Sequence, residues 1–474
     1  MEAKRLRALK RAFTYLVALI VGAIWIGAPS DALIEKDAEQ NLAMAYNFTH
    51  YGVMSLDTDR APENLRPSRY REPLPVLLLS GYLLALDPVL DGDSFDELLR
   101  GTNARWLKYS NILWGALLVA TIFLTARTLR LPPWFAALAL LLAHIPLAEH
   151  YGTLYSEIAG AALIALASYV ALLAVRDRRL TLFFLAGLSF GALMLTKASY
   201  FYVAIVLVLL YLGYALYGRD TAKRGFAWQS TALLILGIAV VVAPWMIRNQ
   251  MQFGSPSIAD RGGLVLITRA VKNEMTAEEY VGTFYAYAPR WLQWPIGALT
   301  GFKSEDVRAG GRLERLKRGA NSADELAGEE GRVDDAISYY WRAKAMRAPK
   351  LAAHEAAGHP NPLAAADAEL KQDAIEMIKA NPGDHLKLTL PFIWRGAPFM
   401  LPFLLVILVY AWRRRDAPLA AYVVPSLGLI GFYAALSHFI PRYAEPNAPV
   451  VAICAVLLLH RWLEARATGS QAHL

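Results

Sequence analysis

The chain has 474 residues, of which 56% are hydrophobic and 19% are charged, and its formal net charge is +8. Soluble globular domains are about 45–50% apolar and about 25% charged, so this composition points away from that class. The high hydrophobicity excludes an intrinsically disordered chain, and a single cysteine, Cys454, excludes a disulfide scaffold. The basic residues do not cluster on one soluble surface, so the positive charge does not predict a nucleic-acid partner.

The apolar residues are gathered in segments that are long enough to span a membrane, which takes roughly 20 predominantly apolar residues per helix. We count about ten such segments, at 13–28, 112–126, 134–148, 158–175, 180–195, 200–217, 230–245, 391–412, 417–436 and 450–463. A further apolar stretch, 73–86, is short, and its length favours a re-entrant or interfacial helix. We expect the first span to stay attached, because no small-residue cleavage site of a signal peptide accompanies it.

The basic residues of the short loops fall mainly on one side of this arrangement. They lie in the N-terminal stretch 4–11, around Arg127 and Arg130, and at Arg413 and its two neighbours. By the positive-inside rule this side is the cytoplasm, and both chain ends lie on it. The sequence therefore predicts an all-α integral membrane protein with three regions. These are a membrane module with its first outer loop (30–110) over 1–247, a mainly helical soluble outer domain over 248–390, and a C-terminal membrane module with a cytoplasmic tail over 391–474.

Acidic residues open the first outer segment. Asp37 begins a stretch, 37–51, in which Leu42, Ala45 and Thr49 recur at helical spacing, and this pattern predicts an amphipathic helix at the membrane surface. A carboxylate at the start of such a helix is able to accept a proton from an acceptor hydroxyl or amine. The alternative is a structural role, in which the acidic side chain interacts with the helix dipole.

Six motifs occur in chain order on the predicted outer side. They are Asp37 to Phe48 followed by Gly52, Arg69-Tyr-Arg-Glu-Pro-Leu-Pro, Leu154-Tyr-Ser-Glu157, Gly187 to Lys197, Pro244-Trp-Met-Ile-Arg248-Asn249, and Arg442-Tyr443 with Pro446. Together they resemble the GT-C membrane glycosyltransferases of the family 39 group, which includes protein O-mannosyltransferases and bacterial lipid A aminoarabinose transferases. The resemblance covers most of residues 1–460. It departs at Ala38, where many members have Glu, and at Asn41, which replaces a common tyrosine.

The resemblance implies that a sugar moves from a polyprenyl-phosphate-linked donor to an acceptor by inverting displacement. It implies catalytic roles for Asp37, as general base or acceptor-binding residue, and for Glu157. A departing lipid phosphate needs positive charge, and arginine offers it bidentate hydrogen bonds. The candidates for binding the donor phosphate are Arg442, Arg248, Lys197, Arg71 and Arg69. The candidates for binding the acceptor or the sugar are Tyr443, Asn249, His438 and Glu39. For Arg248 and Lys197 the alternative is a side chain that only extends to the interface at the end of a span.

A divalent metal ion is a further possibility. Glu149 and His150 precede Glu157 on one outer loop, and Asp37 or His438 would be able to join them in space. Carboxylate oxygens and imidazole nitrogens are suitable ligands for a divalent cation. The sequence shows no other cofactor signature, because it contains neither a GxGxxG fingerprint nor a Walker loop. This pattern agrees with a lipid-linked donor.

Two other functions are compatible with these observations. One is a transporter or flippase of polyprenyl-linked sugars, and the other is a non-catalytic assembly protein with the GT-C fold. A transporter predicts ionisable residues at mid-span depth and interrupted helices, whereas charged residues here gather at the ends of the spans. We expect a protein of the bacterial inner membrane with its active site on the periplasmic face. Its expected partners are an undecaprenyl-type donor and a lipid, glycan or protein acceptor, with no nucleic acid.

Overall fold

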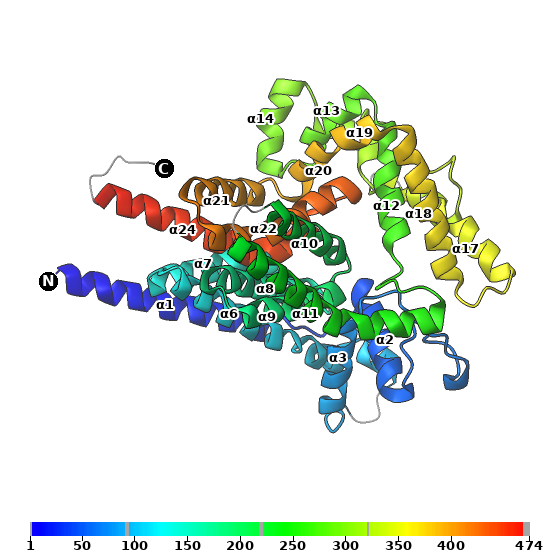
Figure 1. Cartoon of the computed structure of the whole chain (residues 1–474). Coiled ribbons are helices and arrows are strands. Elements are labelled where there is room, and N and C mark those ends of the chain that lie inside the picture. The colour runs from blue at the N-terminus through cyan, green and yellow to red at the C-terminus, as the bar shows by residue number, and fades with distance from the viewer. Residues whose placement is uncertain (1, 91–93, 218–220, 320–321, 468–474) are drawn as a thin grey trace. The chain divides into compact units, whose positions relative to one another are not determined.

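The computed structural model describes residues 2–90, 94–217, 221–319 and 322–467. It is 78% helical, and no β-strand occurs among the described residues, which confirms the predicted all-α class (Figure 1). Internal contacts divide the chain into two compact units. Unit 1 comprises Met1–Ile258, Phe399–Leu429 and Ala444–Leu474, and unit 2 comprises Ala259–Pro398 and Ile430–Tyr443. The sequence places domain limits after residues 247 and 390, and these limits remain a prediction.

Unit 1 holds most of the apolar helices. They are α1 (Glu2–Gly27), α2 (Asp37–Tyr51), α3 (Pro73–Leu86), α4 (Phe95–Leu98), α5 (Gly101–Lys108), α6 (Asn111–Thr128), α7 (Pro133–Leu147), α8 (Glu157–Asp177), α9 (Leu180–Thr196), α10 (Ser199–Tyr217), α11 (Thr221–Phe253), α21 (Met400–Arg414), α22 (Ala417–Leu436) and α24 (Ala448–Ala467), with the 3-10 helices η1 (Pro62–Asn64), η2 (Ala148–Gly152) and η6 (Glu445–Asn447). The end of α22, from Ile430, belongs to unit 2.

Seven helices in the described residues are long and apolar enough to cross a membrane, or up to eight if one bent pair counts as a single span. These helices account for eight of the predicted segments. The segments at 180–195 and 200–217 fall on shorter apolar helices. The α9 helix has 17 residues, which at 1.5 Å per residue is about 25 Å, less than a bilayer core of about 30 Å. The count of ten spans therefore stays a prediction, as does the assignment of sides.

The predicted span 391–412 is interrupted in the structure. Helix α20 (Thr389–Gly396) ends before Pro398, and α21 begins after it at Met400. Proline disfavours a helical conformation in the residue before it and lacks the N–H that would continue the ladder. The interruption therefore follows from a single residue inside an otherwise apolar segment, and the bent pair is formed by the helices on either side of it.

Helix α9 packs against α8 on one side and α11 on the other. The α9–α11 crossing is close because glycines face one another there. A Cβ atom on Gly187 would lie 2.2 Å from the carbonyl oxygen of Leu234, and a Cβ on Gly237 would lie 2.3 Å from that of Phe184. Small residues allow this kind of close backbone approach between membrane helices.

The amphipathic helix predicted at 37–51 is confirmed as α2, with the same limits. Its buried face, which includes Leu42 and Met44, packs against Val76 and Leu83 of α3 in one apolar cluster. The helix ends at Gly52, whose φ of 69° lies in the left-handed region that favours glycine. This packing fixes the direction of the first turn of α2.

Unit 2 is built from short helices. They are α12 (Gly262–Ala270), α13 (Ala277–Ala286), α14 (Arg290–Thr300), α15 (Ser322–Glu330), α16 (Tyr339–Ala345), α17 (Arg347–Ala356), α18 (Pro362–Ala380), α19 (Pro382–Lys387), α20 and α23 (Pro441–Ala444), with η3 (Val271–Glu274), η4 (Ser304–Val307) and η5 (Glu314–Leu316). Helix α18 ends before Asn381. Its residue Asp367 accepts the N–H groups of Gly263 and Leu264 at 2.8 and 2.9 Å, which satisfies the first turn of α12.

Candidate active site

Asp37 is the first residue of α2, so its carboxylate lies at the positive end of the helix dipole. The residue before it, Lys36, has a φ of 59°, a region that residues other than glycine seldom adopt. The Asp37 side chain is 24% exposed, and its Oδ1 lies 3.1 Å from Nη1 of Arg71. The local backbone thus presents a partly accessible carboxylate to a guanidinium.

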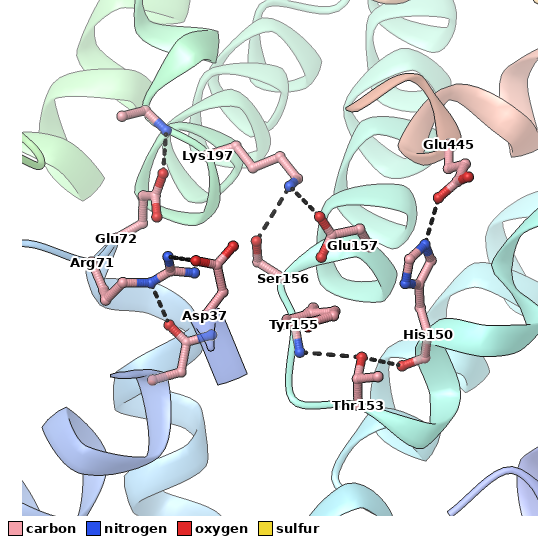
Figure 2. A network of polar contacts seen from close by, with 12 residues as sticks. Asp37, Arg71, Glu72, His150, Thr153, Tyr155, Ser156, Glu157, Lys197 and Glu445 are labelled. Carbon is pink, nitrogen blue, oxygen red and sulfur yellow. Dashed lines mark hydrogen bonds and ion pairs between the residues drawn. The ribbon is translucent and has the colours of Figure 1, made fainter. Parts of the chain in front are cut away.

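Arg71 connects the start of α2 to the loop before α8. Its side chain is 3% exposed, and its Nε donates a hydrogen bond of 2.9 Å to Oδ1 of Asn41, one turn after Asp37. The Nδ2 of Asn41 then donates to the carbonyl of Leu154 at 2.8 Å. Figure 2 shows Arg71 facing Asp37 in this arrangement. The residue predicted to bind donor phosphate is therefore paired with the predicted base.

A second ion pair joins α8 and α9. Lys197 follows the last residue of α9, and its Nζ lies 3.4 Å from Oε1 of Glu157 and 3.3 Å from Oγ of Ser156 (Figure 2). The Glu157 side chain is 1% exposed. One turn further along α8, a Cβ atom on Gly160 would lie 3.0 Å from Cε of Lys197, so the glycine leaves room for the lysine. Buried charges of this kind are tolerated only when they are paired.

Glu72 is electrostatically coupled to both pairs. It precedes the first residue of α3, and its Oε1 accepts the backbone N–H of Ala198 at 3.4 Å (Figure 2). Burial raises the pKa of the Glu72 carboxyl, the charge of Lys197 lowers it, and the charge of Asp37 raises it. The sequence prediction did not include Glu72, although this residue lies inside one of the six motifs. Its one local signal is its position directly before the proline that starts an apolar helix.

The predicted metal ligands Glu149 and His150 lie in η2. The Nε2 of His150 is 2.5 Å from Oε2 of Glu445 and 4.0 Å from Oε1 of Glu149. These three ligand atoms all lie within 4.8 Å of one another, and Figure 2 shows His150 facing Glu445. Glu445, from η6, was not predicted as a ligand. It is 295 residues away from His150 in sequence, so no local pattern links the two.

An apolar pocket of about 440 Å³ lies in unit 1 between α2, α3, α9 and α11. Its lining includes Phe48, Leu77, Leu195 and Trp245, with Arg248 as a charged member. Pro73, which directly follows Glu72, also lines it, and Leu195 is two residues before Lys197. The pocket therefore adjoins the elements that carry the polar network.

Two of the predicted phosphate-binding arginines share an aromatic ring beside this pocket. The guanidinium of Arg248 lies 4.6 Å from the ring centre of Trp245 and 5.2 Å from that of Phe253. The guanidinium of Arg69 lies 4.9 Å from the same Phe253 ring and donates to the carbonyl of Ser255. Stacking on aromatic faces holds a guanidinium in place while leaving its edge available for hydrogen bonds.

The predicted acceptor-binding or sugar-binding residues of unit 1 have different surroundings. Asn249 is fully buried, and its Nδ2 donates to the carbonyl of Ser257 at 2.7 Å while its Oδ1 accepts from Arg248 at 2.8 Å. Glu39 lies in the first turn of α2 and is exposed. Asn249 thus anchors the segment that follows α11, whereas Glu39 is accessible to solvent.

The remaining predicted site residues belong to unit 2. The ring of His438 lies 5.3 Å from that of Tyr443 and 6.4 Å from that of Tyr340, and its backbone carbonyl accepts from Arg395 at 3.0 Å. Burial and nearby cations lower the pKa of the His438 imidazole well below its ordinary value. Arg442 is half-buried in α23.

The described part of the chain thus combines several helices long and apolar enough to cross a membrane with a polar network and an adjoining apolar pocket. Residues 97–247 match the family model described as dolichyl-phosphate-mannose-protein mannosyltransferase. This match agrees, over that segment, with the resemblance to GT-C glycosyltransferases. Glu157 and Lys197 lie within the matched segment, whereas Asp37 and Arg71 precede it. No curated protein matches the chain.

Proposed function

We propose that this protein transfers a sugar from a polyprenyl-phosphate-linked donor to an acceptor at the outer face of the membrane. The observation that carries the proposal is the apolar pocket, because it is lined by Arg248 and adjoins the elements that carry Asp37 and Lys197. A mostly apolar pocket with few polar groups suits a lipid tail whose charged head lies at one end. The family match supports a donor of this class.

The proposed reaction is one displacement at the anomeric carbon of the sugar. The acceptor oxygen or nitrogen forms a bond to that carbon, and the bond to the phosphate oxygen breaks. The polyprenyl phosphate leaves with the bonding electron pair, and Asp37 takes the acceptor proton as general base. A single displacement inverts the anomeric configuration. The guanidinium of Arg248 stabilises the charge that grows on the departing phosphate.

Arg71 has a positioning role in this proposal. Its Nη1 forms an ion pair with the Asp37 carboxylate, and its hydrogen bond to Asn41 limits the directions in which it can hold that carboxylate. Lys197 adds positive charge close to Glu72 and Glu157. Glu157 is too buried to meet an acceptor directly in this arrangement, so we assign it the positioning of Lys197.

The test compares Asp37→Asn with the wild-type protein in lipid nanodiscs supplied with polyprenyl-phosphate sugars and candidate acceptors. General base catalysis contributes typically 10²–10⁴-fold, so turnover in the variant should fall by at least about 100-fold. Binding of the donor should be retained. The control is Glu35→Gln, which removes an exposed carboxylate two residues before Asp37.

Undiminished donor consumption in Asp37→Asn would rule out this residue as the base. Movement of the donor between leaflets without cleavage, measured in sealed vesicles, would contradict the transfer reaction itself and support a flippase.

We also propose that Glu149, His150 and Glu445 bind a divalent cation. One imidazole and two carboxylates whose ligand atoms lie within 4.8 Å suit zinc in particular. The bound ion would supply positive charge beside the polar network.

The purified protein should bind about one zinc ion per chain, which EDTA removes, and His150→Gln should lose this bound zinc. The measurement is metal content by mass spectrometry, with His50→Gln, an exposed histidine of α2, as control. Equal zinc content in both variants would exclude this site.

A further inference from the structure

Unit 2 contains buried positive charge that the proposed reaction does not use. Arg269, in α12, and Lys272, in η3, are 0% and 3% exposed. Arg395, in α20, is half-buried. Burial lowers the pKa of the Lys272 ammonium well below its ordinary value, and the charges of Arg395 and Arg269 lower it further. The three cations therefore lie close enough to repel one another.

The contacts of the two fully buried cations are with neutral groups. Lys272 Nζ donates to the carbonyl of Thr268 and lies 5.9 Å from the ring centre of Phe392. Arg269 donates to the carbonyl of His385 at 2.5 Å, and its guanidinium lies 4.6 Å from the same Phe392 ring. Carbonyls and aromatic faces stabilise a cation, but they do not cancel its charge.

Arg395 has contacts of the same kind. It donates to the carbonyl of His438 at 3.0 Å, and its guanidinium lies 4.4 Å from the ring centre of Tyr287. Within the described ranges, no carboxylate forms an ion pair with Arg269, Lys272 or Arg395. Holding several like charges in a protein interior without a counter-charge is energetically unfavourable.

One carboxylate that acts on this cluster is Glu279, and it has other partners. It accepts hydrogen bonds from the hydroxyl of Tyr339 and the N–H of Thr276, both at 2.9 Å, and lies 3.6 Å from Arg315. The charge of Glu279 acts on Tyr287, but its ion pair in the described structure is with Arg315 and not with any of the three cations.

Buried polar atoms around the cations are also left without hydrogen-bond partners in the described structure. They are Nε of Arg269, Nδ2 of Asn273, Oη of Tyr287 and Nδ1 of His438. Each is able to donate a hydrogen bond, with His438 doing so in the tautomer that carries the proton on Nδ1. Because buried polar groups in proteins almost always have partners, such a set points to a missing acceptor.

We propose that this cluster of Arg269, Lys272, Arg395, Asn273, Tyr287 and His438 binds the phosphoryl group of a phosphate-bearing ligand. A phosphoryl dianion would account for both the unpaired positive charge and the buried donors, because it carries negative charge and its several oxygens accept several hydrogen bonds at once. Arginine and lysine together are the common protein ligands of phosphate. A single carboxylate carries less charge and fewer acceptor positions. The site lies in unit 2 alone, so it does not depend on the proposed transfer reaction in unit 1.

The experiment measures phosphate binding to the full-length protein in a zwitterionic detergent by isothermal titration calorimetry. Inorganic phosphate is expected to bind the wild type and the control Lys387→Gln, an exposed lysine paired with Asp384, with the same Kd. Binding should be at least about tenfold weaker in Lys272→Met and in Arg395→Gln, because each loses a charged donor. The difference should persist in an Arg248→Met background, which removes the charged pocket residue of unit 1.

Thermal unfolding separates loss of the ligand from loss of the fold. Without phosphate, Lys272→Met should unfold at a higher temperature than the wild type, because it removes a buried charge without a counter-charge. With phosphate, the wild type should gain stability and Lys272→Met should not. Equal phosphate binding by the wild type and both variants, or no binding by the folded wild type at about 10 mM, would overturn the proposal.

The source of the phosphoryl group is resolved by two further ligands. Tighter Lys272-dependent binding of dodecyl phosphate than of methyl phosphate assigns the site to a lipid headgroup. Equal binding of the two assigns it to a free phosphate or a soluble phosphate ester. Both results support a phosphate site in unit 2.

Discussion

At the scale of single residues, the two ion pairs of the candidate active site differ in their access to solvent. The Asp37 side chain is 24% exposed beside a buried arginine, whereas Glu157 and Lys197 are 1% and 10% exposed. A carboxylate that an acceptor can reach is able to exchange a proton with it, and a fully enclosed pair is not. This difference supports Asp37 as the base and gives the Glu157–Lys197 pair a supporting function.

Removing one partner of the enclosed pair should therefore destabilise the protein. Lys197→Met leaves the Glu157 charge buried without compensation, and the expected loss is about 3–5 kcal/mol in the free energy of unfolding. The double variant Lys197→Met/Glu157→Gln should recover most of that stability without recovering turnover. The measurement is chemical unfolding in detergent. The control is Arg176→Met, whose partner Asp177 is exposed on the same helix, and which should cost less than about 1 kcal/mol.

A Lys197→Met protein as stable as the wild type would contradict the structural importance of this ion pair.

Site residues inside a recognised motif could be predicted from the sequence, whereas residues that join the site through long-range contacts could not. Asp37 and Arg71 belong to motifs on the first outer segment, and the structure pairs them. Glu72 was quoted in a motif but not chosen, because its coupling to Lys197 depends on how α3 meets the end of α9. Glu445 meets His150 across 295 residues of sequence, and single-sequence patterns carry no information on such a contact.

At the scale of helices, the close crossing of α9 and α11 shapes the apolar pocket. Both helices supply lining residues, Leu195 from α9 and Trp245 from α11. The glycines at the crossing allow the two backbones to approach. The distance between these helices therefore sets the width of the pocket.

A side chain at this crossing should disturb both stability and donor binding. In Gly187→Ala the new Cβ would lie 2.2 Å from a backbone oxygen, so the helices must separate, at a cost of about 1–3 kcal/mol. We expect a raised KM for the donor with a smaller change in kcat. The control is Gly81→Ala in α3, where no atom lies within 4 Å of the new Cβ, and which should be neutral or stabilising. An unchanged melting temperature and KM for Gly187→Ala would contradict this account.

The limits of helices were predictable where local signals mark them. Helix α2 begins at Asp37 and ends at Tyr51, as predicted, because amphipathic spacing is a local property of the sequence. The break inside the span predicted at 391–412 was not predictable in this way. Average hydropathy over a window does not register that Pro398 alone interrupts the helix.

At the scale of the whole molecule, the charge asymmetry between loops predicts which side of the membrane each loop occupies. Cys454, the single cysteine, is fully buried. Engineered cysteines therefore report their own accessibility without background from the natural one. The chain is suited to labelling with a membrane-impermeant maleimide.

We expect Glu63→Cys, at an exposed position of η1, to be labelled in intact cells. Thr181→Cys, which is exposed beside Arg178 and Arg179 at the start of α9, should be labelled only after permeabilisation. The wild-type chain, which carries Cys454 alone, is the control and should stay unlabelled. The reverse pattern of accessibility would place the start of α2 on the cytoplasmic side and contradict the proposed location of the reaction.

The backbone at Lys36 has a consequence for engineering. A positive φ in a residue other than glycine costs of the order of 1–3 kcal/mol, and here it directly precedes the proposed base. Selection for heat resistance alone would favour glycine at this position, since glycine relieves the strain. The same change would make the first turn of α2 more flexible and would lower the rate of the proposed transfer reaction. A substitution of Lys36 that raises thermal stability should therefore lower the catalytic rate. Stabilising substitutions for structural work are better placed elsewhere in the chain.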